Sequence, residues 1–140
     1  MEADRELDDF IAKNVMLWKL SNGYDNLVYG RWWYNFNSGH KRFLHYSTPE
    51  FKSNKHNEVW EPSINLKQAW IAVEKFNKRF GEDAKNWLEH GYNSLFSSSI
   101  FALKSDELAN RICQILKHAL KDILSNLDSE TGSEIVNEQA

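Results

Sequence analysis

The residues best suited to chemistry lie in one stretch of the sequence, residues 29–46. Seven aromatic side chains alternate there with basic and histidine side chains, and Asn37-Ser38-Gly39 stands at the centre. Turn residues between two runs rich in aromatics are typical of a β-hairpin. Aromatic faces beside cations can stack a nucleobase or hold a phosphate. The stretch therefore predicts a binding surface, although it names no reaction.

One face of this hairpin must serve the core and leaves the other face for a ligand. Strand alternation favours an inward set. That inward set is Trp32, Tyr34 and Phe36, with Phe43 and His45 as cross-strand partners. The outward candidates for ligand or partner contact are Arg31, Trp33, Lys41 and Arg42, with Tyr46 as a further stacking surface.

A polar loop at 47–59 follows the hairpin and has no hydrophobic period. Loops of this length are often functional or disordered. Lys52, Lys55 and His56 could close over an anion bound at the hairpin. A solvated loop without such a role is the alternative.

Catalytic and metal-binding patterns are missing from the sequence. The five histidines lack ligand spacing, and the serines at 97–99 lack a glycine-framed elbow. Cys113 falls on the apolar side of a predicted helix, where a thiol behaves as a small hydrophobe. Among six glycines there is no phosphate-binding loop. We expect no enzyme activity, no metal and no cofactor.

The charge distribution is uneven although the net charge is only −3. Residues 1–12 carry five acids against one base, and residues 29–57 carry five bases against one acid. The net charge argues against general nucleic-acid binding. A basic centre between acidic ends suits either a small anionic ligand or self-association into a homo-oligomer.

Length, apolar content and cysteine count indicate the class of protein and its cellular compartment. A length of 140 residues with 41% apolar residues fits one domain with a hydrophobic core. A single cysteine fits a reducing cytosol, and no apolar run reaches the length of a membrane span. We expect a soluble cytoplasmic protein.

The elements that position these residues follow from periodicity and from helix caps. Helices are predicted at 4–19, at 66–80 behind the N-cap Asn65, and from Ser105 to 127. Strands are predicted at 28–36 and 41–46, with a second hairpin at 86–90 and 95–103 around a turn at 91–93. The fold class is α+β, a layered sandwich in the order α-β-β-α-β-β-α with a four-stranded antiparallel sheet. The domain spans 1–127, and 128–140 form an acidic flexible tail.

Three segments together resemble the phage "ABA sandwich" domain family. Residues 5–8 and 11–19 are similar to its opening, 59–63 and 66–76 to its middle helix, and 112–120 to its closing helix. The similarity covers most of residues 4–124. Leu17 stands where the family usually has glycine. The resemblance implies a layered fold and a phage or prophage gene, and it brings no catalytic residues.

Together these observations predict a phage-encoded binding protein that acts in the host cytosol against a host defence component. Its target is either a small anionic, nucleotide-like host signal or a host protein. The aromatic and basic hairpin favours the signal, and the six tryptophans favour a protein interface. A self-assembling accessory protein without a ligand is the third alternative.

Overall fold

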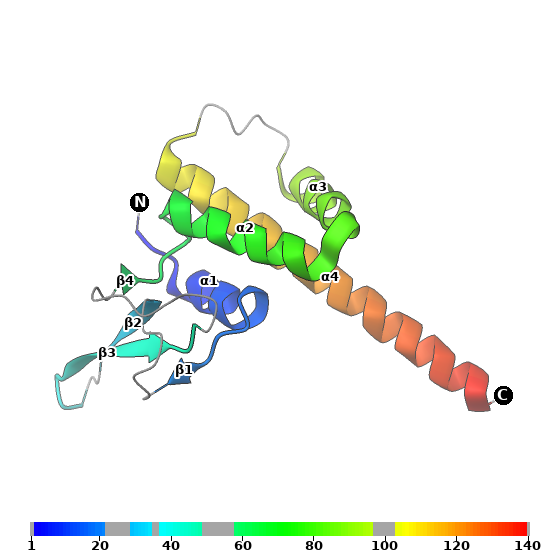
Figure 1. Cartoon of the computed structure of the whole chain (residues 1–140), viewed down its shortest axis with the longest axis horizontal. Coiled ribbons are helices and arrows are strands. Elements are labelled where there is room, and N and C mark those ends of the chain that lie inside the picture. The colour runs from blue at the N-terminus through cyan, green and yellow to red at the C-terminus, as the bar shows by residue number, and fades with distance from the viewer. Residues whose placement is uncertain (1, 22–28, 35–36, 49–57, 97–102, 140) are drawn as a thin grey trace.

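The structure, a computed structural model, describes residues 2–21, 29–34, 37–48, 58–96 and 103–139. The side chains of Ser21, Trp33, Tyr34 and 127–139 are outside the description. The protein combines helices with a β-sheet, so the predicted α+β class is confirmed (Figure 1). None of the helices in the described part of the chain is long and apolar enough to span a membrane.

The first helical segment comprises α1 (Arg5–Phe10) and a π-helical continuation, η1 (Ile11–Val15). Asp4 caps it by accepting a hydrogen bond from Leu7 N, and the acidic first turn suits the helix dipole. The helix predicted at 4–19 is thus confirmed, but it ends earlier. Leu17 adopts a φ of 61°, a left-handed conformation that stops the helix.

The sheet has the strand order β1-β3-β2-β4. β2 (Tyr29–Tyr34) and β3 (Lys41–Tyr46) form the predicted antiparallel hairpin. β1 (Leu20–Ser21) and β4 (Glu58–Val59) are two-residue strands at the edges, and β4 pairs with β2 in parallel. Neither edge strand was predicted. A strand of two residues is too short to show an alternating sequence pattern. Each of these strands forms only through its pairing with β3 or β2.

Gly30 on β2 allows a close approach to Phe43 and Leu44 on β3. A Cβ at this position would lie 2.4 Å from both the Leu44 carbonyl oxygen and the Phe43 ring. The Gly30 carbonyl also accepts a hydrogen bond from Trp60 N at 2.8 Å, which extends the contact beyond β4. A backbone hydrogen bond at Gly30 therefore links the hairpin to the segment after β4.

Helix α2 (Leu66–Phe80) begins and ends as predicted, with Asn65 as N-cap and Gly81 after its last turn. The buried Gln68 side chain reaches back from its first turn. Its amide oxygen accepts from Glu61 N at 2.6 Å, and its Nε2 donates to Val59 O at 2.8 Å. This helix therefore fixes the segment that leads out of β4.

The predicted second hairpin is wrong in its first half. Residues 84–95 form a helix, α3 (Ala84–Leu95), which follows a 3-10 turn, η2 (Gly81–Asp83). Gly91 was interpreted as a turn residue, but it is buried at a close helix contact. A Cβ on Gly91 would lie 3.1 Å from the Ile115 carbonyl oxygen. Most of the second predicted strand, at 97–102, lies outside the described residues.

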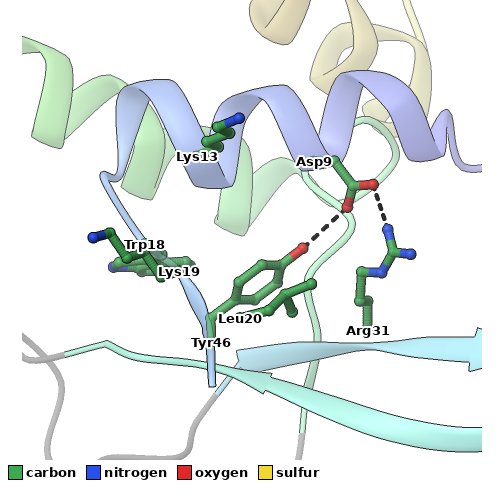
Figure 2. A pocket seen from close by; sticks show the side chains of 7 residues that line it. All are labelled: Asp9, Lys13, Trp18, Lys19, Leu20, Arg31 and Tyr46. Atoms are coloured by element: carbon green, nitrogen blue, oxygen red, sulfur yellow. Dashed lines mark hydrogen bonds and ion pairs between the residues drawn. The ribbon is translucent and has the colours of Figure 1, made fainter. Parts of the chain in front are cut away.

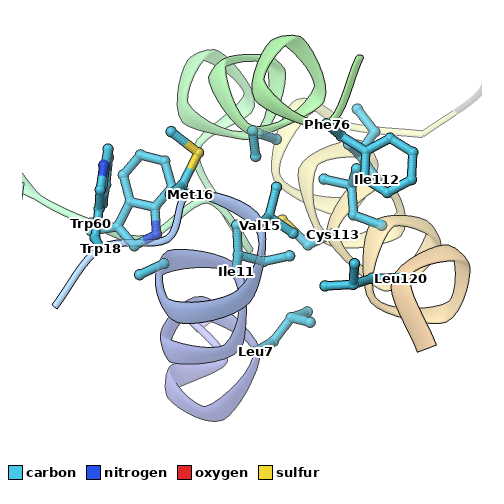
Figure 3. Close-up of a cluster of buried hydrophobic side chains, with 14 of the residues drawn as sticks. Leu7, Ile11, Val15, Met16, Trp18, Trp60, Phe76, Ile112, Cys113 and Leu120 are labelled. Atoms are coloured by element: carbon cyan, nitrogen blue, oxygen red, sulfur yellow. The ribbon is translucent and has the colours of Figure 1, made fainter. Parts of the chain in front are cut away.

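Helix α4 (Ser105–Gln139) starts at the predicted serine and runs beside α2 and α3 (Figure 1). The predicted domain limit at 127 stays a prediction. The main core lies where α1 and η1 pack against α2 and α4 (Figure 3). Its fully buried members include Ile11, Val15, Phe76, Leu116 and Leu120.

A second, aromatic part of the core joins η1 to the sheet. Trp18 stacks on Tyr29 at a centroid distance of 5.5 Å and meets Trp60 edge-on at 4.7 Å. Tyr46 lies 5.9 Å from the Trp18 ring. All four side chains are buried. The aromatics of the hairpin therefore serve partly as core.

Candidate functional site

A carboxylate on α1 joins the first helix to the sheet. Arg31 Nη1 on β2 donates to Asp9 Oδ2, and the Tyr46 hydroxyl on β3 donates to Asp9 Oδ1 at 3.1 Å. Figure 2 shows both side chains converging from the sheet on Asp9 above them. Strand register explains the meeting, because Arg31 pairs with Leu44 and so faces the same side as Tyr46.

One cavity, of about 330 Å³, lies on one side of this contact. We call it the basic cavity, because it gathers three cations and one carboxylate. Its lining residues are Asp9, Lys13, Trp18, Lys19, Leu20, Arg31 and Tyr46 (Figure 2). Its volume falls within the ~300–1,000 Å³ that is usual for small-molecule sites.

Two of the three cations of the basic cavity are available for a ligand. Lys13 and Lys19 are exposed, and neither makes an ion pair within the described part of the chain. Arg31 uses Nη1 for Asp9, but its Nε is buried without a hydrogen-bond partner among the described residues. Burial and the Asp9 carboxylate raise the pKa of Tyr46, so its hydroxyl stays a donor.

A second cavity, of about 230 Å³, also borders this contact. We call it the acidic cavity, because three carboxylates face two arginines there. It is lined by Ala3, Arg5, Asp8, Asp9, Arg31, Trp32, Val59, Trp60 and Glu61. The indole Nε1 of Trp60 is buried and has no partner among the described residues. Asp9 and Arg31 line both cavities and so form the wall that they share.

Asp8 is the buried carboxyl group of the acidic cavity. Its oxygens accept from Ser63 N at 2.7 Å and from Ser63 Oγ at 3.1 Å, while Ser63 Oγ accepts from Asp4 N at 2.8 Å. Burial raises the pKa of Asp8 to about 7, and the charges of Asp4 and Glu61 add to the rise. The bonds from Ser63 oppose that shift. Asp8 is therefore committed to Ser63, which leaves Glu61 as the more open acceptor.

The structure brings two of the predicted site residues together, Arg31 and Tyr46. It places Lys41 elsewhere, with Nζ 4.6 Å from the centroid of the Trp32 ring. Arg42 is exposed on β3 and lines neither cavity. The side chain of Trp33, and all of Lys52, Lys55 and His56, lie outside the described residues.

The predicted faces of the hairpin are wrong for the side chains that can be checked. Trp32, expected inside, is 40% exposed and meets Phe43 edge-on at 5.2 Å. Arg31, expected outside, points to α1. The aromatic residue was assumed to be buried and the charged one exposed. The carboxylate of Asp9 reverses that assumption, because it offers Arg31 a partner on the helix side.

Tyr46 was expected to present a ring for stacking, but it is buried and lies beside Trp18. It contributes a wall and a hydroxyl to the site. The cavities are also lined by four residues that were not predicted from the sequence: Asp9, Lys13, Lys19 and Glu61. The sequence shows acidic residues early and lysines late in the first predicted helix. Only the packing of this segment against the sheet places these residues at the cavities.

Other centres are not supported within the described residues. No group of three histidine, cysteine, aspartate or glutamate side chains there could hold a metal ion. Cys113 is fully buried, and burial raises the pKa of its thiol. No family model, curated protein or solved structure matches the chain.

Proposed function

We propose that the chain is a binding protein without enzymatic activity and that it holds a small phosphate-bearing anion in the basic cavity. The observation that carries the proposal is the gathering of Lys13, Lys19 and Arg31 around a cavity of about 330 Å³ with one carboxylate. A phosphate there would be held by charge-assisted hydrogen bonds from flexible ammonium groups and from the guanidinium.

The aromatic walls favour a ligand that is larger than a free ion. Trp18 and Tyr46 add buried aromatic rings to the lining of the cavity. A nucleotide-like molecule combines a charged phosphate with apolar sugar and ring surfaces. Such a ligand would bind more weakly at high salt, because the exposed lysines are screened by ions.

The biological role that we propose rests on the resemblance to the phage "ABA sandwich" family. Under this hypothesis the chain is a phage or prophage protein of layered α-β-α fold that acts in the host cytosol. By holding a nucleotide-like host signal, it would lower the free concentration of that signal and so counteract a host defence. The binding proposal is independent of this role and is tested separately.

Isothermal titration calorimetry with pyrophosphate and AMP tests the binding proposal. We expect saturable binding that weakens at least tenfold in the double variant Lys13→Glu/Lys19→Glu. Lys67→Glu is the matched control, because Lys67 is exposed on α2 and lines neither cavity. No heat with any phosphate compound at millimolar concentration would contradict the proposal, as would equal binding by the double variant.

A host protein partner or self-assembly is the second candidate, and one observation favours it. Trp70 on α2 is 52% exposed, and exposed tryptophan is common in protein interfaces. Light scattering of the wild-type chain and of Trp70→Ala tests self-assembly. A dimer that dissociates on substitution would support it, and a monomer at high concentration would exclude a homo-oligomer.

A further inference from the structure

A third cavity, of about 240 Å³, is formed where the end of α3 packs against α4 (Figure 1). We call it the α4 cavity. Its lining residues are Leu95, Gln114, Lys117, His118 and Lys121. The four residues from α4 have the spacing of side chains that share one face of a helix. None of the five residues lines the basic or the acidic cavity, so the α4 cavity is a separate site.

The α4 cavity differs from the other two in charge, because no carboxylate is among its described lining residues. Lys121 is exposed and Lys117 is partly buried, and neither makes an ion pair within the described part of the chain. Lys117 Nζ also lies 5.3 Å from the centroid of the Phe10 ring on α1. A concave surface lined by charges of one sign concentrates ions of the opposite sign.

Asp122, the acid next to Lys121 in the sequence, is turned to two histidines. Its Oδ2 lies 3.3 Å from His118 Nδ1 and 3.7 Å from His90 Nε2. His118 Nδ1 is buried, so this contact occupies the closed side of the His118 ring. Asp122 therefore faces the histidines and does not line the cavity with the lysines.

The end of α3 accounts for part of the positive charge at the α4 cavity. Helix α3 ends at Leu95, and the C-terminal end of a helix carries a partial negative charge that attracts cations. That partial charge is roughly half an elementary charge, whereas two lysines carry two. A positive excess therefore remains for a ligand.

Charge and size together indicate the class of ligand. A phosphate monoester carries about −1.5 to −2 charges at pH 7, which balances two ammonium groups better than the single charge of a carboxylate. The volume lies below the ~300–1,000 Å³ of typical small-molecule sites, so the ester must be small. Leu95 is 40% exposed and offers an apolar contact beside the cations.

We propose that the α4 cavity is a second anion site, which binds a small phosphate monoester. Its phosphate group lies against Lys117 and Lys121, and its apolar group lies against Leu95. Ammonium groups and phosphate oxygens form charge-assisted hydrogen bonds. This site is independent of the phosphate binding proposed for the basic cavity, because the two cavities share no lining residue.

Calorimetric titration with phenyl phosphate tests the α4 cavity in the full-length variant Lys13→Glu/Lys19→Glu, which removes two cations from the basic cavity. We expect saturable binding that weakens at least tenfold when Lys117→Glu and Lys121→Glu are added. Lys121→Glu alone should weaken binding at least threefold. This single change affects an exposed side chain, so it keeps the test decisive if the larger variant does not fold.

A matched control separates the site from a general effect of charge. Adding Lys67→Glu and Lys104→Glu to the same background changes the net charge by the same amount. Both residues are exposed and lie outside the three cavities. We expect this control to bind phenyl phosphate as tightly as the background variant does.

Inorganic phosphate and benzoate test the class of ligand. Phenyl phosphate should bind at least threefold more tightly than either, because inorganic phosphate lacks the apolar group and benzoate carries a single charge. Leu95→Gln should remove the preference for phenyl phosphate over inorganic phosphate. It replaces an exposed side chain at the end of α3, so the core is not disturbed.

The possible outcomes separate this site from the basic cavity. Absence of phenyl phosphate binding in Lys13→Glu/Lys19→Glu would overturn the second site, and the basic cavity would still stand or fall by its own titration. Equal weakening in the matched control would also overturn the second site, since binding would then follow net charge. Equal affinity for phenyl phosphate and benzoate would overturn the assignment of a phosphate monoester.

Discussion

The two cavities share Asp9 and Arg31 but differ in how the fold builds them. The aromatic wall of the basic cavity belongs to the core, since Trp18 and Tyr46 are 2% and 4% exposed. The acidic cavity has Trp60 in the core but Trp32 at the surface, 40% exposed. Lys13 and Lys19 of the basic cavity are exposed, whereas the acidic cavity holds the buried carboxyl group of Asp8. One ion pair, Arg31 with Asp9, thus borders both a basic and an acidic cavity.

The largest expected effect comes from the two tryptophans. Trp18→Ala should lower the free energy of unfolding by ~3–5 kcal/mol, because it empties a buried site between three aromatic rings. Trp32→Ala should cost less than about 1 kcal/mol, since its ring is partly in solvent. Urea unfolding of both variants measures these losses. Equal losses of unfolding free energy would contradict the contrast between the buried Trp18 and the partly exposed Trp32.

The buried carboxyl group gives the acidic cavity a pH dependence. Its ordinary pKa is 3.8, and burial raises it to about 7 in the folded state. Between these values the folded chain holds a proton that the unfolded chain has released, so stability falls as pH rises from about 4 to about 7. We expect wild type to lose about 2 kcal/mol more than Asp8→Asn between pH 5 and pH 7.

Asp8→Asn is nearly isosteric with the protonated acid and keeps an acceptor for Ser63 N. Thermal or urea unfolding across this pH range measures the difference. Parallel pH profiles for the two proteins would show that the carboxyl group titrates normally and would remove this distinction between the cavities.

The shared wall can be tested by a double-mutant cycle. Arg31→Met and Asp9→Asn should each destabilise the chain, with a coupling of about 1 kcal/mol because both side chains are partly exposed. Unfolding of the two single variants and of the double variant measures the coupling. Additive effects would mean that the pair does not act as a unit.

The smallest effect concerns the turn that leads to Lys19 in the basic cavity. Leu17 holds a φ of 61° and is 58% exposed, so its side chain contributes little burial. Leu17→Gly should raise stability by about 0.5 kcal/mol, as relief of strain exceeds the entropy cost of glycine. Leu17→Ala is the control, because alanine retains the strain. A loss of stability in the glycine variant would contradict this account.

Sequence patterns correctly predicted the elements that have several turns of hydrophobic periodicity, a turn sequence or a helix cap. The helix at 66–80, the hairpin and the start of the last helix all follow from such local features. Patterns failed where a contact between distant segments decides the structure. Gly91 serves a helix contact with Ile115, and β4 exists only through its pairing with β2.

The sequence predicted the kind of site, cations beside aromatic side chains, but few of the residues that line it. A cation beside aromatics was expected from residues 29–46, and Arg31 and Tyr46 do line a cavity. The partners of these residues come from α1 and from the turn after β4. No spacing in the sequence relates Asp9 to Arg31 or Glu61 to Trp32, since only the packed fold brings these segments together.

The most direct test is an NMR titration of the ¹⁵N-labelled chain with ribose 5-phosphate and then with GMP. If the basic cavity binds phosphate, both ligands should cause saturable shifts in the backbone amides of Lys13, Lys19 and Tyr46. If neither ligand moves the three amides in a saturable way, the basic cavity does not bind phosphate.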